Sequence, residues 1–224
     1  MNKATNNTFI YLLQIIISGL LMFVLMSIVS RYLSSEELGG FVLTQVYSGI
    51  AVGIANFGVL VGYERNFFIF EKSAIKSGEL ISTALIFVAF NLLLLTTLVY
   101  FYQSNINLMF FSNKIPSQMF LIVVIGTSMS SLSQYYLFFL KNHGMAKSYV
   151  KFTIINSVVN FIIAVVFLTQ TNLKSMSLAY AWMASNLSFS TLLFYILSIT
   201  CFLITKNYTN CSQHGDVIFL TEVS

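Results

Sequence analysis

Charged residues are scarce in this chain, and their scarcity indicates its class. Only 8% of the 224 residues are Asp, Glu, Lys or Arg, whereas a soluble domain carries about 25%. Hydrophobic residues make up 57% of the chain. This balance excludes an ordinary soluble domain, and the composition predicts a membrane protein.

Proline, cysteine and histidine are also rare, with one, two and two residues. Cys201 and Cys211 belong to no metal-binding or redox motif, so we expect free thiols and no disulfide framework. His143 and His214 are isolated, which argues against a zinc centre or a histidine-based catalytic cluster. The common nucleophile, zinc-protease and phosphate-loop motifs are missing as well. We therefore expect no enzyme activity, no catalytic residue, no metal and no cofactor.

Long hydrophobic runs, in contrast, are plentiful, and six of them reach the roughly 20 residues that a membrane-spanning helix needs. They are residues 9–29, 39–63, 80–102, 119–140, 152–169 and 176–205. The longest connection, 103–118, is expected on the outer side of the membrane. The predicted fold is all-α and polytopic, with a six-transmembrane-helix bundle over residues 1–205 and a short cytoplasmic tail over 206–224.

Lysine and arginine are shared unevenly between the two sides of this predicted bundle. With the N-terminus inside, eight basic residues fall on the inner side and three on the outer side. The inner residues are Lys3, Arg65, Lys72, Lys76, Lys141, Lys147, Lys151 and Lys206, and the outer residues are Arg31, Lys114 and Lys174. Because cytoplasmic loops carry the excess of positive charge, we expect an N-in/C-in orientation. The net charge of +4 is then a topology signal and no indication of nucleic-acid binding.

Uncharged polar side chains recur inside the predicted spans. The candidates for lining a cavity are Asn56, Thr127, Ser131, Gln134, Asn156 and Asn160. Such groups either line a hydrated path or join helices by hydrogen bonds, each worth about 0.6 kcal/mol on average. Two small-xxx-small pairs in the second span, Gly49/Gly53 and Gly58/Gly62, predict close packing between helices.

Charge is confined to the ends of the spans, which argues against a proton pump or a voltage sensor, since both need charges at membrane depth. Ser34 and Glu37 have the spacing of a capping box and are expected to open the second helix. Glu36 and Glu37 are adjacent and diverge on a helix, so they make a poor acid/base pair. The capping box gives no role to Arg31, which lies in the same connection.

Three pieces of the sequence form a recognisable series. They are SRYLSSEELGGFVL (30–43), NFGVLVGYERNFF (56–68) and FFLKNHGMAKSYVKFTIINSVVNFIIAVVFL (138–168). In this order, and over about residues 5–200, the chain resembles the N-terminal half of bacterial oligosaccharide (O-antigen) flippases of the multidrug/oligosaccharidyl-lipid/polysaccharide exporter superfamily. The resemblance implies a protein of the bacterial cytoplasmic membrane that moves a polyprenyl-diphosphate-linked oligosaccharide to the outer leaflet for surface polysaccharide synthesis.

The resemblance also implies that cations of the chain contact the diphosphate of that substrate. Arg65, at the inner end of the second span, is the first candidate, since arginine binds phosphate through two hydrogen bonds. Arg31 is the second candidate. Lys141, Lys147 and Lys151 are expected to attract the head group to the inner mouth. The alternative is that these charges only set the topology and contact lipid phosphates.

The number of spans departs from the family, whose members have about twelve spans in two halves on either side of the pathway. Two explanations stay open: a truncated product, which is favoured, or a parallel homodimer. Two other functions also stay open. One is a drug or cation exporter of the same superfamily, which would need a buried carboxylate. The other is a non-transporting scaffold for polysaccharide-assembly proteins. The expected partners are lipid-linked oligosaccharide, membrane lipids, and a second copy or assembly proteins.

Overall fold

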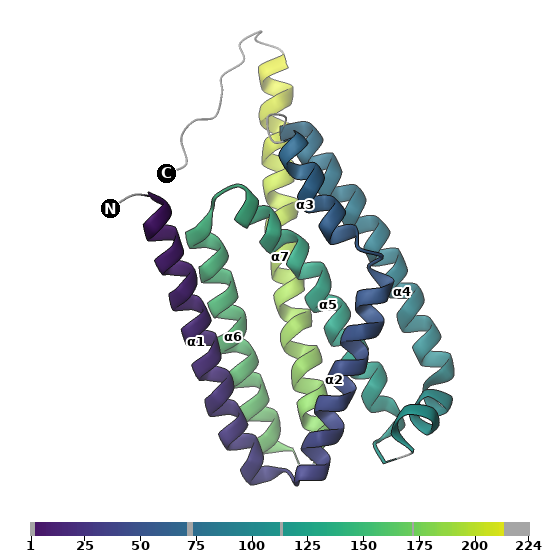
Figure 1. Ribbon diagram of the computed structural model, residues 1–224. Helices are drawn as coiled ribbons and strands as arrows, with labels where there is room; N and C mark the ends of the chain where they lie inside the picture. The colour runs from purple at the N-terminus through teal and green to yellow at the C-terminus, as the bar shows by residue number, and fades with distance from the viewer. Residues whose placement is uncertain (1–2, 71–73, 113, 172, 213–224) are drawn as a thin grey trace.

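The computed structural model is all-helical over the residues that it describes, 3–70, 74–112, 114–171 and 173–212 (Figure 1). Side chains are described for residues 8–69, 78–112, 114–171 and 173–193. The helices of this part are α1 (Lys3–Tyr32), α2 (Ser35–Ala55), α3 (Val59–Phe70), α4 (Ala74–Phe111), α5 (Ser117–Asn142), α6 (Ala146–Gln170) and α7 (Ser175–Ser212). α1 begins and α7 ends at the same end of the bundle.

Within the described side chains, five helices are long and apolar enough to cross a membrane. They are Thr8–Tyr32, Ser35–Ala55, Gly78–Phe111, Ser117–Asn142 and Ala146–Gln170. The prediction of a multi-pass helical membrane protein is thereby confirmed. The predicted sixth span, 176–205, is helical within α7, but the side chains of its second half lie outside the described residues. Six spans and their orientation therefore stay predictions, and the predicted tail, 206–224, begins inside α7.

Helix α5 is the centre of the bundle and packs against α2, α4 and α7. Helix α6 packs against α1 on one side and α7 on the other, so α7 joins two groups of helices. α1 and α2 meet at one end of the bundle and diverge towards the other (Figure 1). Between these groups lies an apolar core that includes Val29, Met119, Val123 and Ala179, each 2% exposed or less.

The second predicted span is interrupted, because α2 ends at Ala55 and α3 begins only at Val59. Phe57 and Gly58 between them have positive φ angles, 47° and 67°. Since a left-handed conformation cannot continue a right-handed helix, the chain breaks there. The prediction of one continuous helix over 39–63 is corrected accordingly.

The predicted outer loop 103–118 is also mostly helical, because α4 runs on to Phe111. The side-chain amide of Asn107 donates a hydrogen bond of 2.9 Å to the carbonyl of Ile115, which folds the remaining connection back onto the helix. Phe111 is buried, and its ring centroid lies 5.9 Å from that of Phe120 on α5. This aromatic contact and the amide bond extend α4 beyond the predicted end of the span.

The glycine pairs of the second span do not pack against other helices in the described part of this chain. Among the described residues, no heavy atom outside the local helix lies within 4 Å of a Cβ built at Gly49, Gly53, Gly58 or Gly62. The predicted close packing is therefore not found within the chain, since this face of α2 and α3 points away from the described helices.

The close approach occurs instead at Gly126 of α5. A Cβ at Gly126 would lie 2.7 Å from a ring carbon of Trp182 and 3.0 Å from the Cα atom of Met183, both on α7. Only the absence of a side chain lets α5 and α7 come this near. Gly126 therefore sets the depth at which the Trp182 ring sits in the bundle.

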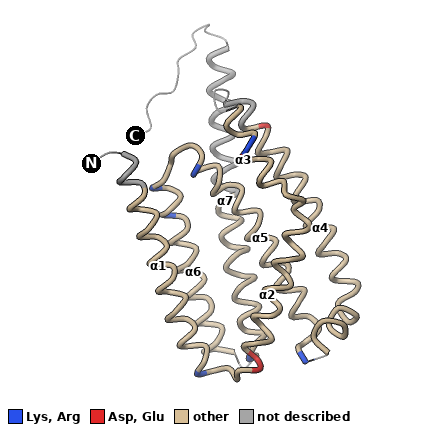
Figure 2. The backbone as a smooth tube through the Cα atoms, viewed as in Figure 1, with Lys and Arg blue, Asp and Glu red and all other residues tan. Residues whose placement is uncertain are grey.

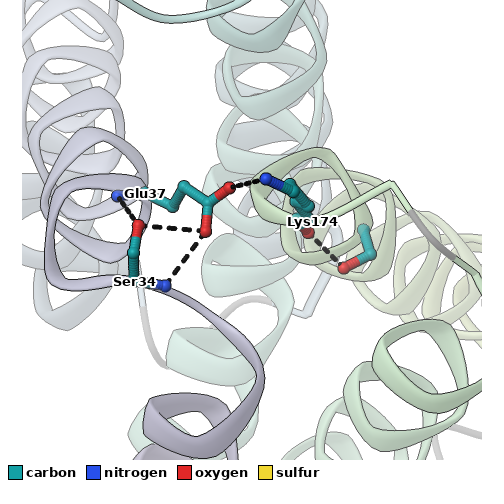
Figure 3. A network of polar contacts seen from close by, with 4 residues as sticks. Ser34, Glu37 and Lys174 are labelled. Carbon is teal, nitrogen blue, oxygen red and sulfur yellow. Dashed lines mark hydrogen bonds and ion pairs between the residues drawn. The ribbon is translucent and has the colours of Figure 1, made fainter.

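The predicted capping box is confirmed at the start of α2 (Figure 3). The backbone N–H of Glu37 donates to the Ser34 hydroxyl at 3.3 Å, and the backbone N–H of Ser34 donates to the Glu37 carboxylate at 3.0 Å. The other oxygen of Glu37 lies 3.1 Å from Nζ of Lys174, in the connection before α7. Glu37 thus caps its own helix and joins it to a distant segment.

Candidate functional site

A polar cleft of about 210 Å³ lies between α1, α5, α6 and α7. Its lining consists of Ser18, Leu21, Met22, Leu25, Ser130, Asn156, Ser157, Asn160, Phe161, Trp182 and Asn186. None of these residues carries a charge. The cleft therefore combines neutral hydrogen-bonding groups with an apolar wall inside a membrane bundle.

Helix α6 supplies the largest polar share of this lining. Asn156 and Asn160 are four residues apart and so lie on one face of the helix. The Asn160 amide donates a hydrogen bond of 3.2 Å to the hydroxyl of Ser185 on α7. On the other side, the hydroxyl oxygens of Ser157 and Ser18 of α1 lie 2.9 Å apart and share a hydrogen bond. These polar contacts hold three walls of the cleft together.

Asn156 stands out because its side-chain oxygen is buried and accepts no hydrogen bond from the described residues. A buried acceptor without a donor costs about 1–3 kcal/mol. Asn156 thus contributes a polar side chain to the cleft lining while its oxygen is covered by the protein.

Helix α7 contributes the aromatic wall. The indole N–H of Trp182 donates to the hydroxyl of Thr127 on α5, at 3.4 Å. The carbonyl of Trp182 accepts a hydrogen bond of 2.8 Å from the Asn186 amide one turn later. The indole is thus positioned by its hydrogen bond to α5 and packs into the space that Gly126 leaves. Trp182 also lines the cleft.

The predicted cavity-lining residues fall into two groups. Asn156 and Asn160 line the cleft, whereas Asn56, Thr127, Ser131 and Gln134 do not. Thr127 joins helices, since its hydroxyl lies 3.1 Å from that of Ser48 on α2, and Gln134 is exposed. Sequence reasoning missed the contribution of Ser18 and Ser157 to the cleft, and the only signals were single hydroxyls in apolar runs. It also missed Trp182, which is the one tryptophan of the chain.

Asn56 and Ser131 instead form a clamp at the break between α2 and α3. The Asn56 amide donates to the Val52 carbonyl at 3.0 Å and to the Ser131 hydroxyl at 2.9 Å. The Tyr135 hydroxyl lies 3.5 Å from the amide oxygen of Asn56. Ser131 follows Ser130 of the cleft directly on α5, so the clamp and the cleft lie at the same depth on neighbouring faces of one helix.

The predicted cationic residues lie elsewhere, since Lys and Arg are found near the two ends of the bundle (Figure 2). All five are exposed, and none of them lines the cleft: Arg31, Arg65, Lys141, Lys147 and Lys151. Nζ of Lys141 lies 3.8 Å from the carboxylate of Glu64 on α3 and 5.0 Å from the ring centroid of Phe138. Arg31 lies in the last turn of α1, where a cation favours the negative end of the helix dipole.

The chemistry open to the cleft is the binding of a neutral, polar group. Among the described residues, no three His, Cys, Asp or Glu side chains lie together in a way that could hold a metal ion. The cleft lining also contains no carboxylate for proton transfer. No family model, curated protein or solved structure matches this chain.

Proposed function

We propose that this chain forms one wall of a flippase, which moves a polyprenyl-diphosphate-linked oligosaccharide from the cytoplasmic to the outer leaflet of a bacterial inner membrane. The observation that carries the proposal is the neutral polar cleft, lined by three asparagines and three serines within a membrane bundle. Sugars are uncharged and rich in hydroxyls, and a membrane-buried cleft of this kind offers them hydrogen bonds that lipid does not.

The cationic residues complete the proposed recognition of the substrate. Arg65, Lys141, Lys147 and Lys151 lie on the inner side in the proposed N-in/C-in orientation. The diphosphate is anionic and stays near the head groups, where an exposed Arg65 can reach it. The prenyl chain needs no protein path because lipid already solvates it. A second bundle facing this one, such as a second copy of the chain, would supply the other wall of the pathway.

The break between α2 and α3 is a feature shared with secondary transporters, in which interrupted helices are common. Here the two left-handed residues lie on an exposed face, and Asn56 clamps the break onto α5. A drug or cation exporter is less well supported, because no carboxylate lines the cleft.

Rescue of a bacterial strain that lacks its oligosaccharide flippase tests the proposal. The chain is expressed alone, as a tandem fusion of two copies, and extended by the second half of an oligosaccharide flippase, and surface polysaccharide is measured at matched protein levels in the membrane. We expect export from the tandem fusion if two copies pair, and from the extended chain if this one is a truncated half. Membrane-inserted protein without any polysaccharide in all three forms would refute the proposal, and so would a change in drug resistance alone.

Substitutions of the cationic residues test the proposed contact with the diphosphate. Arg65→Ala is expected to lower polysaccharide export about tenfold, which corresponds to about 1.4 kcal/mol of lost substrate interaction. Arg65→Lys keeps the charge but loses the bidentate hydrogen bonding of the guanidinium, so it should retain part of the export. Lys114→Ala, an exposed change on the opposite side, is the control and should leave export unchanged.

A further inference from the structure

We propose that the first half of α6 is a binding surface for an anionic phospholipid, whose phosphate contacts Lys147 and Lys151 and whose acyl chains lie along the apolar residues of the same helix face. This inference goes beyond the proposed function and does not depend on it. It requires only a membrane bundle and the placement of these two lysines on α6.

The exposed side chains of α6 follow one face of the helix. Between residues 146 and 168, the exposed residues are Lys147, Lys151, Ile155, Val158, Ile162 and Val166. They are three or four positions apart, so they form a single stripe along the helix. Within the described part of the chain, α1 and α7 are the main neighbours of α6 and cover its other sides. In a membrane, this stripe therefore faces lipid.

The positive charge at the start of the stripe is uncompensated. Lys147 and Lys151 are one helical turn apart, a spacing at which like charges repel. Neither forms an ion pair with a described residue, whereas Nζ of Lys141, just before α6, lies 3.8 Å from the Glu64 carboxylate. The first turn of α6 also contains no acidic residue. A phosphate group would supply the missing counter-charge and relieve the repulsion.

The apolar part of the stripe identifies the ligand as a lipid. Ile155, Val158 and Ile162 are 40%, 37% and 53% exposed and continue the face of the lysines towards the middle of the span. Lysines near the end of a membrane helix extend their cations to the head-group level. The phosphate and acyl chains of one phospholipid match this order. A second copy fits less well, because a symmetric parallel pair through the stripe would bring four lysines together.

The stripe is separate from the cleft. Asn160, which lines the cleft, lies two residues from both Val158 and Ile162, so it is on the opposite side of α6. A lipid on the stripe does not present its head group to the cleft. The ligand is therefore a resident phospholipid, and Arg65 and Lys141 remain for the diphosphate of the proposed substrate.

Native mass spectrometry of the full chain, released from detergent micelles, tests the assignment. The chain is titrated with dioleoyl phosphatidylglycerol, and dioleoyl phosphatidylcholine is the control probe, with the same acyl chains and no net charge. We expect phosphatidylglycerol to bind at least about tenfold more tightly. Lys147→Gln/Lys151→Gln should lower this preference about tenfold, since each lysine contributes to the attraction of an anionic head group.

Two further double variants control for charge. Lys147→Arg/Lys151→Arg keeps both cations and should keep the preference for phosphatidylglycerol. Lys114→Gln/Lys174→Gln removes two exposed lysines from the connections at the other end of the bundle, so it makes the same change in net charge. It should leave the preference unchanged.

Equal binding of the two lipids to the unaltered chain would overturn the inference, and so would an unchanged preference in folded Lys147→Gln/Lys151→Gln. Circular dichroism verifies folding, and if this double variant does not fold, the two single variants take its place. Polyprenyl diphosphate is the third probe. If it bound more tightly than phosphatidylglycerol, and only with both lysines present, the surface would belong to the substrate. A lipid-free dimer that needs the lysines would assign it to a second copy, and either result would overturn the proposal.

Discussion

Asn56 of α2 donates a 2.9 Å hydrogen bond to the hydroxyl of Ser131 on α5, at the point where the second membrane span is interrupted. The same amide group also donates to the Val52 carbonyl, which lies in the last turn of α2. The Val52 carbonyl already accepts the backbone N–H of Asn56 at 3.0 Å, so the side chain adds a second hydrogen bond at the helix end and attaches that end to the central helix. Such a fixed break lets α3 take its own direction while α2 stays packed on α5.

The first prediction concerns this pair. Asn56→Ala and Ser131→Ala are each expected to destabilise the folded chain, and their combination should show a coupling of about 0.6 kcal/mol, as for hydrogen bonds between membrane helices. Unfolding in mixed micelles, followed by circular dichroism, measures the free energies of unfolding. Strictly additive effects would contradict the clamp.

The second prediction separates two glycines of the interrupted span. Gly58 has a φ of +67°, whereas Gly62 lies within α3, and both have open space at the Cβ position. Gly58→Ala should therefore cost about 1–2 kcal/mol through backbone strain alone. Gly62→Ala should be neutral or slightly stabilising, since alanine favours a helix interior. Equal free energies of unfolding for the two variants would show that the left-handed conformation is not required.

The third prediction concerns the contact between α5 and α7. Gly126→Ala forces a methyl group against Trp182 and the Met183 backbone, which should lower the free energy of unfolding by about 1–3 kcal/mol. The displaced indole should also shift the tryptophan emission. Gly53→Ala, on the open face of α2, is the control; it should not lower the free energy of unfolding and should not shift the emission.

The fourth prediction divides the two roles of Glu37. Glu37→Gln keeps a capping-box side chain but removes the ion pair with Lys174, so it should lower the free energy of unfolding slightly and only at low salt. Ser34→Ala removes the cap itself and should cost about 1 kcal/mol at any salt concentration. Thermal unfolding at low and high salt distinguishes them. A salt-independent loss in Glu37→Gln would show that the ion pair contributes nothing.

Local features of the chain were accessible to sequence reasoning. The capping box depends on Ser34 and Glu37, three residues apart, and the structure has it as predicted. The helical segments follow from apolar runs of sufficient length, and the helices contain them except at the break. Asn56 was recognised as a polar residue within a span, but its role depends on Ser131, a residue 75 positions away.

The sequence by itself determined that this protein is a helical membrane protein, because hydropathy and segment length are properties of each run of residues alone. Only the tertiary structure decided which glycine lies at a helix contact, since Gly49 and Gly126 differ in the helix that faces them. It likewise decided that Asn156 lines a cleft, whereas Asn56 attaches the end of α2 to Ser131 of α5. The physical reason is that a side chain's partner depends on how separate helices are placed against one another. The local sequence pattern within one helix does not determine that placement.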